Sequence, residues 1–309
     1  MPMELKDKVA VVTGAARGMG RSFAAGFLRE GARLAAIDLS WQPQGVSNDR
    51  DDSWMAELQS RDDVLCLTAD ISRQEQVEAA FEATIQRWGT VDVLCNNAGL
   101  RQRILFPPGL PVTVMQTGND DFRKMYEVTV FGTLLMTRIY AQPMIEQKRG
   151  SIFSVITGGV LMRPDVNGYR YLRPNSREQP YTSAKAALAN IMCYLGDELQ
   201  PDNVAVNAFA PGHTRTSGFD EQAEGRTKIG CAAGPVPYHP DHVQPLAIFL
   251  AQQDAKSGNT AKIWDTVSWL IDHGYGPMDR WLCPGGDIWQ PGAPGSWAAA
   301  GLAAQLQPE

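Results

Sequence analysis

One glycine-rich turn, residues 13–20 (TGAARGMG), constrains the fold more than any other stretch of the chain. It follows a short apolar run, residues 8–13, that is rich in valine and predicts a buried strand. An amphipathic helix comes next and ends near Gly31, and residues 33–38 (RLAAID) predict a second strand that ends in an acid. Glycines between a strand and a helix let the backbone approach a pyrophosphate at the helix N-terminus. The turn therefore predicts a βαβ unit that binds a dinucleotide.

The acid that closes the second strand, Asp38, indicates which dinucleotide this is. A carboxylate at this place accepts hydrogen bonds from both ribose hydroxyls of NAD and repels the 2′-phosphate of NADP. Arg17 in the glycine turn is a cation that could meet such a phosphate, but Leu39 and Ser40, which follow the acid, are not basic. The sequence favours NAD over NADP.

Composition bounds the class of protein. The chain has 309 residues, of which 44% are hydrophobic and 20% charged, which suits one large globular domain or one domain with additions. Its net charge of -6, without a long basic run, argues against nucleic acid or an anionic membrane as a partner. The five cysteines lack CxxC spacing, so we expect reduced thiols in a cytoplasmic protein. The histidines have no ligand-like spacing, and we expect no metal site.

Residues 181–185 (YTSAK) carry a candidate acid/base pair. Tyr181 and Lys185 are four residues apart, so on a helix they share one face. A phenol ordinarily titrates near pH ~10, and an adjacent ammonium favours the phenolate. A tyrosine with such a neighbour can exchange a proton with a substrate oxygen near neutral pH.

Two further motifs stand between the glycine turn and this pair. Asp70 and Ile71 follow a predicted strand over residues 64–69, and residues 96–99 (NNAG) follow another over residues 91–95. With these motifs in this order, the chain resembles the short-chain dehydrogenase/reductase family, in its compact single-domain branch. The resemblance covers about residues 5–265.

The family resemblance implies an α/β fold of the Rossmann type: a doubly wound parallel sheet between two helical layers. It implies one domain over residues 1–265 that holds both the cofactor and the catalytic sites. Residues 259–265 match the last strand of the family, which leaves residues 266–309 as a C-terminal extension packed on the domain or on a neighbouring subunit. A rival register through Gly285 and Gly286 would need a long insertion.

The resemblance and the glycine turn together predict the cofactor contacts. They lie in the turn, at strand ends, in the active-site helix and in a later Pro-Gly loop, and comprise Gly14, Arg17, Gly18, Met19, Gly20, Asp38, Asp70, Ile71, Asn96, Ala98, Gly99, Tyr181, Lys185, Pro211, Gly212, Thr214 and Thr216.

Two threonines stand where the family usually has other residues. The family carries an asparagine, part of a proton relay to the lysine, three residues before a glycine of the long helix. Here Thr129 precedes Gly132 at that distance, in a predicted helix over residues 119–147 interrupted near Pro143. At the end of the fifth predicted strand the family has a serine that holds the substrate oxygen, and here Thr157 takes its place. These departures leave open a relative that binds NAD without catalysis.

The substrate is not indicated by any motif. Long segments surround the predicted site, namely residues 100–118, an arginine-rich insert over residues 161–180 and a lid over residues 214–240. Candidate substrate contacts within or beside them are Arg101, Arg103, Arg163 and His213. An arginine there could bind a substrate carboxylate, and the alternative is an ordinary solvated loop.

We therefore predict an NAD-dependent oxidoreductase that interconverts a secondary alcohol and a ketone, with Tyr181 as general acid/base and a small molecule as its substrate. Reduction of an imine on the same fold is the other catalytic alternative. The resemblance implies a homotetramer or a homodimer.

Overall fold

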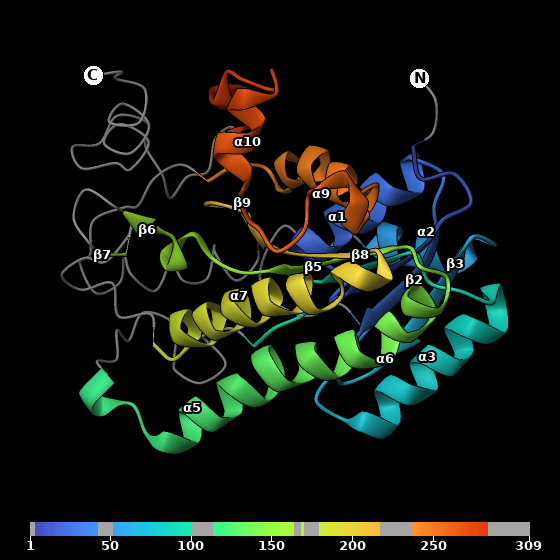
Figure 1. Cartoon of the computed structure of the whole chain (residues 1–309), viewed down its shortest axis with the longest axis horizontal. Helices are drawn as coiled ribbons and strands as arrows, with labels where there is room; N and C mark the ends of the chain where they lie inside the picture. Colours follow the sequence, from blue (N-terminus) through green and yellow to red (C-terminus); the bar gives the residue numbers. More distant parts are fainter. Residues whose placement is uncertain are drawn as a thin grey trace.

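The computed structural model describes residues 4–42, 52–100, 114–163, 168–169, 179–216 and 237–283. Within these residues one parallel sheet of seven strands forms the centre, in the order β3-β2-β1-β4-β5-β8-β9 (Figure 1). Its strands are β1 (Val9–Thr13), β2 (Arg33–Asp38), β3 (Val64–Thr68), β4 (Val93–Asn96), β5 (Gly150–Val155), β8 (Val204–Ala210) and β9 (Ile263–Asp265). This order reverses direction between β1 and β4, and ligands of open α/β sheets bind at such a reversal.

Helices cover both faces of the sheet (Figure 1). They are α1 (Gly18–Arg29), α2 (Asp52–Ser60), α3 (Gln74–Trp88), α5 (Asn119–Tyr126), α6 (Thr133–Glu146), α7 (Tyr181–Glu198), α9 (Gln244–Ala251) and α10 (Thr266–Asp272). Short elements complete the described chain: β6 (Met162–Arg163), β7 (Gly168–Tyr169), η1 (Val114–Gln116), η2 (Glu127–Gly132), η3 (Gly158–Val160), η5 (Gln200–Asp202), η6 (Pro240–Val243), η7 (Ala255–Ser257) and η8 (Met278–Trp281). The predicted doubly wound α/β fold is confirmed.

The central strands β1, β4, β5 and β8 are buried along their length and mostly apolar, because helices cover both faces of the sheet there. Alternate residues of β1 therefore enter different cores: Val12 packs with α1, α2, α9 and α10, whereas Val11 packs with α3, α6 and α7. In the first core the Phe23 ring of α1 stands edge-on to Phe153 of β5 and Phe209 of β8, with centroid distances of 6.1 and 5.6 Å. Such pairs stabilise by about 1 kcal/mol each, and they hold α1 against the sheet.

The long helix predicted over residues 119–147 is interrupted, but not at the predicted place. Helix α6 passes through Pro143 and continues to Glu146. The proline lacks an N–H and so removes one backbone hydrogen bond, but it does not end the helix. The irregularity is η2, a π-helical segment between α5 and α6. Segments of this kind gather at functional sites, and this one contains Thr129.

The chain continues past β9 directly into α10. Strand β9 pairs with β8 and lies at the edge of the sheet. Trp269 and Leu270 of α10 are buried in the core that also contains α9. Further on, Leu282 pairs through its backbone with Tyr238. No helix among the described residues is long and apolar enough to cross a membrane.

Candidate active site

The glycine turn has the backbone that the sequence predicts. Gly14 and Gly18 have positive φ angles of 68° and 55°, which residues other than glycine rarely adopt. A Cβ on Gly20 would lie 1.9 Å from the Gly14 carbonyl oxygen, so α1 reaches the turn only because this residue has none. Thr13 Oγ1 accepts hydrogen bonds of 3.0 Å from the backbone N–H groups of Asn97 and Ala98. The turn after β1 is thus joined to the loop after β4.

The N-terminus of α1 fits an anion. Its N-cap residue, Arg17, makes no side-chain cap hydrogen bond, and its first turn contains no acidic side chain. The first N–H groups of a helix have no partner within the helix and carry a partial positive charge. Across from them Thr216 approaches closely, because a Cβ on Gly18 would lie 3.3 Å from Thr216 Cγ2. These features fit the pyrophosphate of a dinucleotide.

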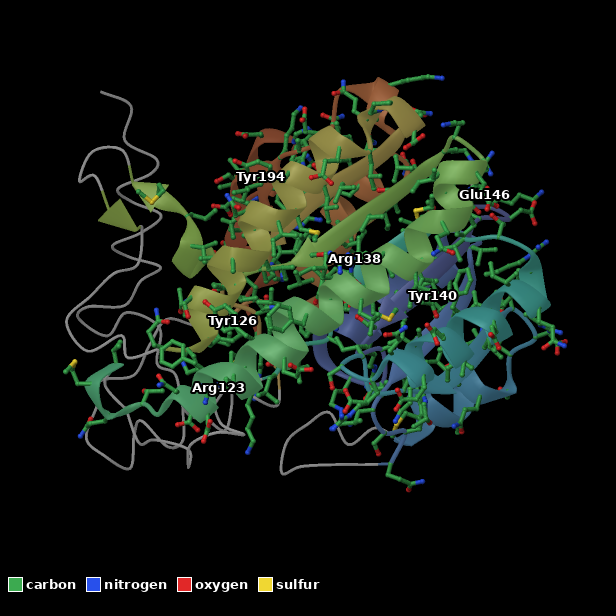
Figure 2. All side chains as sticks on the ribbon, turned by 60° about the horizontal axis from the view of Figure 1, so that its bottom comes forward. Arg123, Tyr126, Arg138, Tyr140, Glu146 and Tyr194 are labelled. Carbon is green, nitrogen blue, oxygen red and sulfur yellow. The ribbon has the colours of Figure 1, made fainter. Side chains whose placement is uncertain are left out.

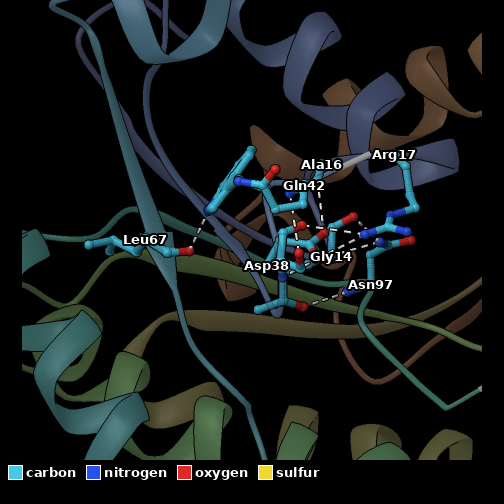
Figure 3. Close-up of polar contacts among 10 residues, drawn as sticks. Gly14, Ala16, Arg17, Asp38, Gln42, Leu67 and Asn97 are labelled. Atoms are coloured by element: carbon cyan, nitrogen blue, oxygen red, sulfur yellow. Dashed lines mark hydrogen bonds and ion pairs between the residues drawn. The ribbon is translucent and has the colours of Figure 1, made fainter. Parts of the chain in front are cut away.

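Asp38 lies at the carboxyl end of β2 with 8% of its surface exposed. Its oxygens accept hydrogen bonds from the backbone N–H of Ala16 at 3.0 Å and of Ser40 at 3.2 Å. The guanidinium of Arg17 lies 3.9 Å from Oδ1 and also donates to the Ser40 carbonyl at 3.4 Å (Figure 3). Arg17 therefore extends over the acid that the sequence singled out.

The other residues predicted to contact the cofactor near the glycine turn differ in their surroundings. Asp70 and Ile71 follow β3, the strand next to β2, so they share its sheet edge, and Asp70 Oδ1 accepts a 2.7 Å hydrogen bond from Ser72 Oγ. The Asn96 side chain is instead buried and donates to Thr137 Oγ1 at 3.0 Å and to Ser154 Oγ at 3.3 Å. We infer that only the backbone of Asn96 is available to a ligand. Met19 of α1 packs against the hydrophobic core that contains Phe23.

Tyr181 and Lys185 both lie on α7, in its first two turns. The Lys185 Nζ atom is 6.0 Å from the centroid of the Tyr181 ring and donates a 2.6 Å hydrogen bond to the Val155 carbonyl at the end of β5. Lys185 is 3% exposed. This burial lowers the pKa of the lysine from 10.5 to about 8. The cation beside the tyrosine is therefore desolvated, which strengthens its effect on nearby charge.

Thr129 lies beside this lysine. A Cβ on Gly99 would be 3.4 Å from Lys185 Nζ and 3.7 Å from Thr129 Oγ1, so both groups border the space next to that glycine. Thr129 is fully buried in η2, and its hydroxyl oxygen accepts a 3.3 Å hydrogen bond from the Leu100 N–H. Figure 2 shows the helices on this side of the sheet, with Tyr126 of α5 and Tyr194 of α7 labelled.

Thr157 lies two residues beyond the end of β5, which closes at Val155. The threonine is the N-cap of η3, and its Oγ1 accepts a 3.3 Å hydrogen bond from Gly159 N–H. A Cβ on Gly159 would lie 3.4 Å from Thr182 of α7, so this short turn sits against the start of the helix that carries Tyr181. The Thr157 hydroxyl keeps a proton to donate.

The Pro-Gly loop follows β8, and Gly212 has a φ of 79°. The Thr214 side chain is buried, and its hydroxyl has no hydrogen-bond partner among the described residues, which fits a ligand group such as a carboxamide. His213 contributes its carbonyl oxygen to a 2.7 Å hydrogen bond from Tyr238 N–H.

Sequence reasoning missed one histidine of this loop region. The imidazole of His242 is fully buried, and its Nε2 lies 2.6 Å from the carbonyl oxygen of Pro211. The two residues are 31 apart in the chain, and the only available signal is that His242 is a polar residue at the start of an apolar helix.

Several predicted substrate contacts lie outside the described residues: Arg101, Arg103 and the side chain of Arg163. Within the described ranges no three histidine, cysteine or acidic side chains gather in a way that could bind a metal ion.

Three features lie at one edge of the parallel sheet: the glycine turn, a helix N-terminus without a side-chain cap, and a tyrosine with a buried lysine near its ring. Together they are typical of a dinucleotide-dependent oxidoreductase. A family model described as short chain dehydrogenase matches residues 8–227, and the chain belongs to this family. It is thus an oxidoreductase of CH–OH donors with a nicotinamide cofactor.

Known relatives agree with this assignment. The chain is 41% identical over 278 residues to fluoren-9-ol dehydrogenase of Terrabacter sp. (strain DBF63), covering 90% of this chain and 76% of the relative. It is 27% identical to the 3-oxoacyl-[acyl-carrier-protein] reductase FabG of Thermotoga maritima, covering 82% and 94%. The crystal structure of the 3-ketoacyl-(acyl-carrier-protein) reductase from Brucella melitensis complexed with NADH aligns with a TM-score of 0.65, 28% identity and coverage of 84% and 97%.

Proposed function

We propose that the protein is an NAD-dependent dehydrogenase that interconverts a secondary alcohol and a ketone, with Tyr181 as general acid/base. The observation that carries this proposal is the buried Lys185 ammonium, 6.0 Å from the Tyr181 ring. It stands at the same sheet edge as the glycine turn, so a nicotinamide and a proton-transfer group would meet there.

Each residue has a distinct task in alcohol oxidation. A nicotinamide bound at this site would supply the acceptor for the hydride of the substrate carbon. Tyr181, in its phenolate form, takes the hydroxyl proton as the carbonyl forms. Lys185 stabilises this phenolate before the proton is transferred. The Thr157 hydroxyl donates to the substrate oxygen and orients it. Thr129, beside Lys185, belongs to the path by which the proton reaches solvent.

For the cofactor, we propose NAD over NADP because the Asp38 carboxylate would oppose a 2′-phosphate. Arg17 acts against this preference, since its guanidinium is 3.9 Å from the Asp38 carboxylate. Asp38 nevertheless has two backbone N–H partners that fix its position at the end of β2. A carboxylate fixed in this way keeps its negative charge at the end of β2, where the ribose would bind.

The substrate is proposed to be a bulky apolar secondary alcohol. Tyr181 packs against a small apolar cluster in which Met125, Val130 and Ala184 are buried, and Leu100 and Tyr126 pack against the same cluster. The relative of 41% identity is named for fluoren-9-ol, a rigid aromatic secondary alcohol. An arginine that binds a substrate carboxylate, among Arg101, Arg103 and Arg163, is a further proposal, and it predicts preference for an acid over its matched ester.

The test is a hydride-transfer assay on fluoren-9-ol, a small aliphatic secondary alcohol and a primary alcohol, each with NAD and with NADP. Formation of the reduced nicotinamide with fluoren-9-ol and NAD is the expected result. Binding of NAD without turnover on any alcohol or ketone would favour the non-catalytic alternative, and turnover only on imines would favour the imine reductase.

We also propose that residues 1–265 form the unit that carries both sites, in a cytoplasmic homodimer or homotetramer. Exposed apolar side chains on η2 and α7, Phe131 and Tyr194, support contact with a second copy. Size-exclusion chromatography with light scattering tests the assembly.

A further inference from the structure

A short segment, residues 239–244, contacts both α1 and the Pro-Gly loop. It contains η6 and the first residue of α9. On one side it reaches α1, the helix that begins at the glycine turn. Ser22 Oγ of α1 donates a 2.7 Å hydrogen bond to Asp241 Oδ1, and Gln244 Nε2 donates to the same carboxylate oxygen at 2.8 Å and to the Ser22 carbonyl at 3.0 Å.

On its other side the segment reaches the Pro-Gly loop through His242. The ring nitrogen Nε2 lies 2.6 Å from the Pro211 carbonyl oxygen, and Nδ1 lies 2.8 Å from the carbonyl oxygen of His239. Next to it, Tyr238 forms two backbone hydrogen bonds with the loop, donating to His213 at 2.7 Å and accepting from Arg215 at 2.9 Å. The loop is thus attached on both sides of Thr214.

The chemistry of the ring makes the Pro211 contact specific. An oxygen acceptor at this distance requires an N–H at Nε2, because two lone pairs would repel each other. Burial lowers the pKa of His242, because the charged imidazolium is poorly solvated there. Nδ1 makes the same kind of contact with the His239 carbonyl oxygen at 2.8 Å, and the Nε2 contact with Pro211 is the shorter of the two. Gly212, directly after this carbonyl, has the positive φ at which the loop turns.

We propose that His242 is a positioning residue for the cofactor. By donating to the Pro211 carbonyl it fixes the turn at Gly212 and, through it, the buried Thr214 hydroxyl, which has no hydrogen-bond partner among the described residues and would be available to the nicotinamide half of the dinucleotide. Asp241 and Gln244 hold the same segment on α1, so the two halves of the cofactor site keep a constant separation. This inference rests on the proposed NAD dependence.

The test uses two amides that imitate the two ring nitrogens. In His242→Gln the amide nitrogen stands as many bonds from Cα as Nε2 does, so it can still donate to Pro211. In His242→Asn the amide nitrogen matches Nδ1, so it reaches only His239. The dissociation constant of NADH, measured by fluorescence, should rise about tenfold in His242→Asn and stay within about twofold in His242→Gln. The KM for NAD should follow the same order, while kcat at saturating NAD changes less.

A control and a second readout separate the possible failures. His273 also contacts a carbonyl oxygen through Nδ1, that of Trp269 at 2.8 Å, but it lies on the α10 side of the fold. His273→Asn should leave NADH binding unchanged. Hydrogen exchange of the Arg215 amide, measured without ligand, should accelerate in His242→Asn and not in His242→Gln. This readout holds even if the wild type binds no NADH, a result that would refute the proposed function alone.

Equal effects of Gln and Asn on the loop amide and on NADH affinity would overturn the role of the Nε2 contact. So would unchanged behaviour of both variants. A His242→Leu variant that fails to fold would not alter this comparison, because the two amide variants keep a polar partner inside the segment.

Discussion

The ammonium nitrogen of Lys185 lies 6.0 Å from the centre of the Tyr181 ring and donates a hydrogen bond of 2.6 Å to the Val155 carbonyl. Among the described residues the lysine is therefore held by the end of β5 and not by an acid. A buried cation without a counter-charge in that part of the chain is costly to the folded state. The poor solvation that causes this cost also strengthens the attraction between the ammonium and a phenolate at Tyr181.

Lys185→Met should reveal that cost through the pH dependence of stability. The folded protein has lowered the lysine pKa from 10.5 to about 8, so between these pH values the unfolded chain keeps a proton that the folded chain has released. The wild type should gain about 3 kcal/mol of unfolding free energy relative to the variant as pH rises through this window. Urea unfolding at several pH values measures it. Lys148→Met, at an exposed lysine, is the control and should show no such trend.

Tyr181→Phe should abolish turnover while NAD binding is kept. The variant preserves the ring in the apolar cluster but has no proton to exchange, and loss of a general acid/base typically lowers kcat by about 10²–10⁴-fold. Steady-state rates and NADH titration check the two parts. Tyr126→Phe removes a hydroxyl from the same cluster and should keep its rate. Wild-type rates in Tyr181→Phe would refute the assigned role.

Thr129→Val tests the threonine in the π-helical segment. Valine keeps the shape but leaves the Leu100 N–H without its acceptor at 3.3 Å. Unfolding free energy should fall by about 1 kcal/mol. If the hydroxyl is part of the proton path, kcat should fall as well, whereas Thr129→Ser should restore both. An unchanged kcat in Thr129→Val would mean that the hydroxyl serves only the fold.

Asp38→Asn should weaken the discrimination between NAD and NADP. The change removes the negative charge that opposes a 2′-phosphate and that lies 3.9 Å from the Arg17 guanidinium. The ratio of kcat/KM for NAD to that for NADP should fall about tenfold or more. Asp70→Asn makes the same change of charge at the end of the neighbouring strand and should leave the ratio as it is. Equal ratios in wild type and Asp38→Asn would show that other groups select the cofactor.

Local sequence patterns predict much of the fold. The valine-rich run of β1 and the acid-ended run of β2 indicate strands because a sheet buried on both faces needs apolar residues throughout. The positions of Gly14, Gly18 and Gly20 also follow from local geometry, since positive φ and close backbone approach require glycine there. The predicted interruption of the long helix at Pro143 was wrong. Proline is a strong sequence signal for a helix break, whereas the sequence of the π-helical segment has no signal of similar strength.

The sequence by itself determined that a dinucleotide turn, a Tyr181–Lys185 pair and a parallel sheet occur in one chain, because each depends on residues close together in the chain. Only the tertiary structure decided what surrounds them. The Val155 carbonyl that holds Lys185, the Arg17 side chain over Asp38 and the His242 ring on Pro211 are contacts between separate elements. Such contacts depend on how helices and loops pack on the sheet, and residue spacing carries no record of that packing.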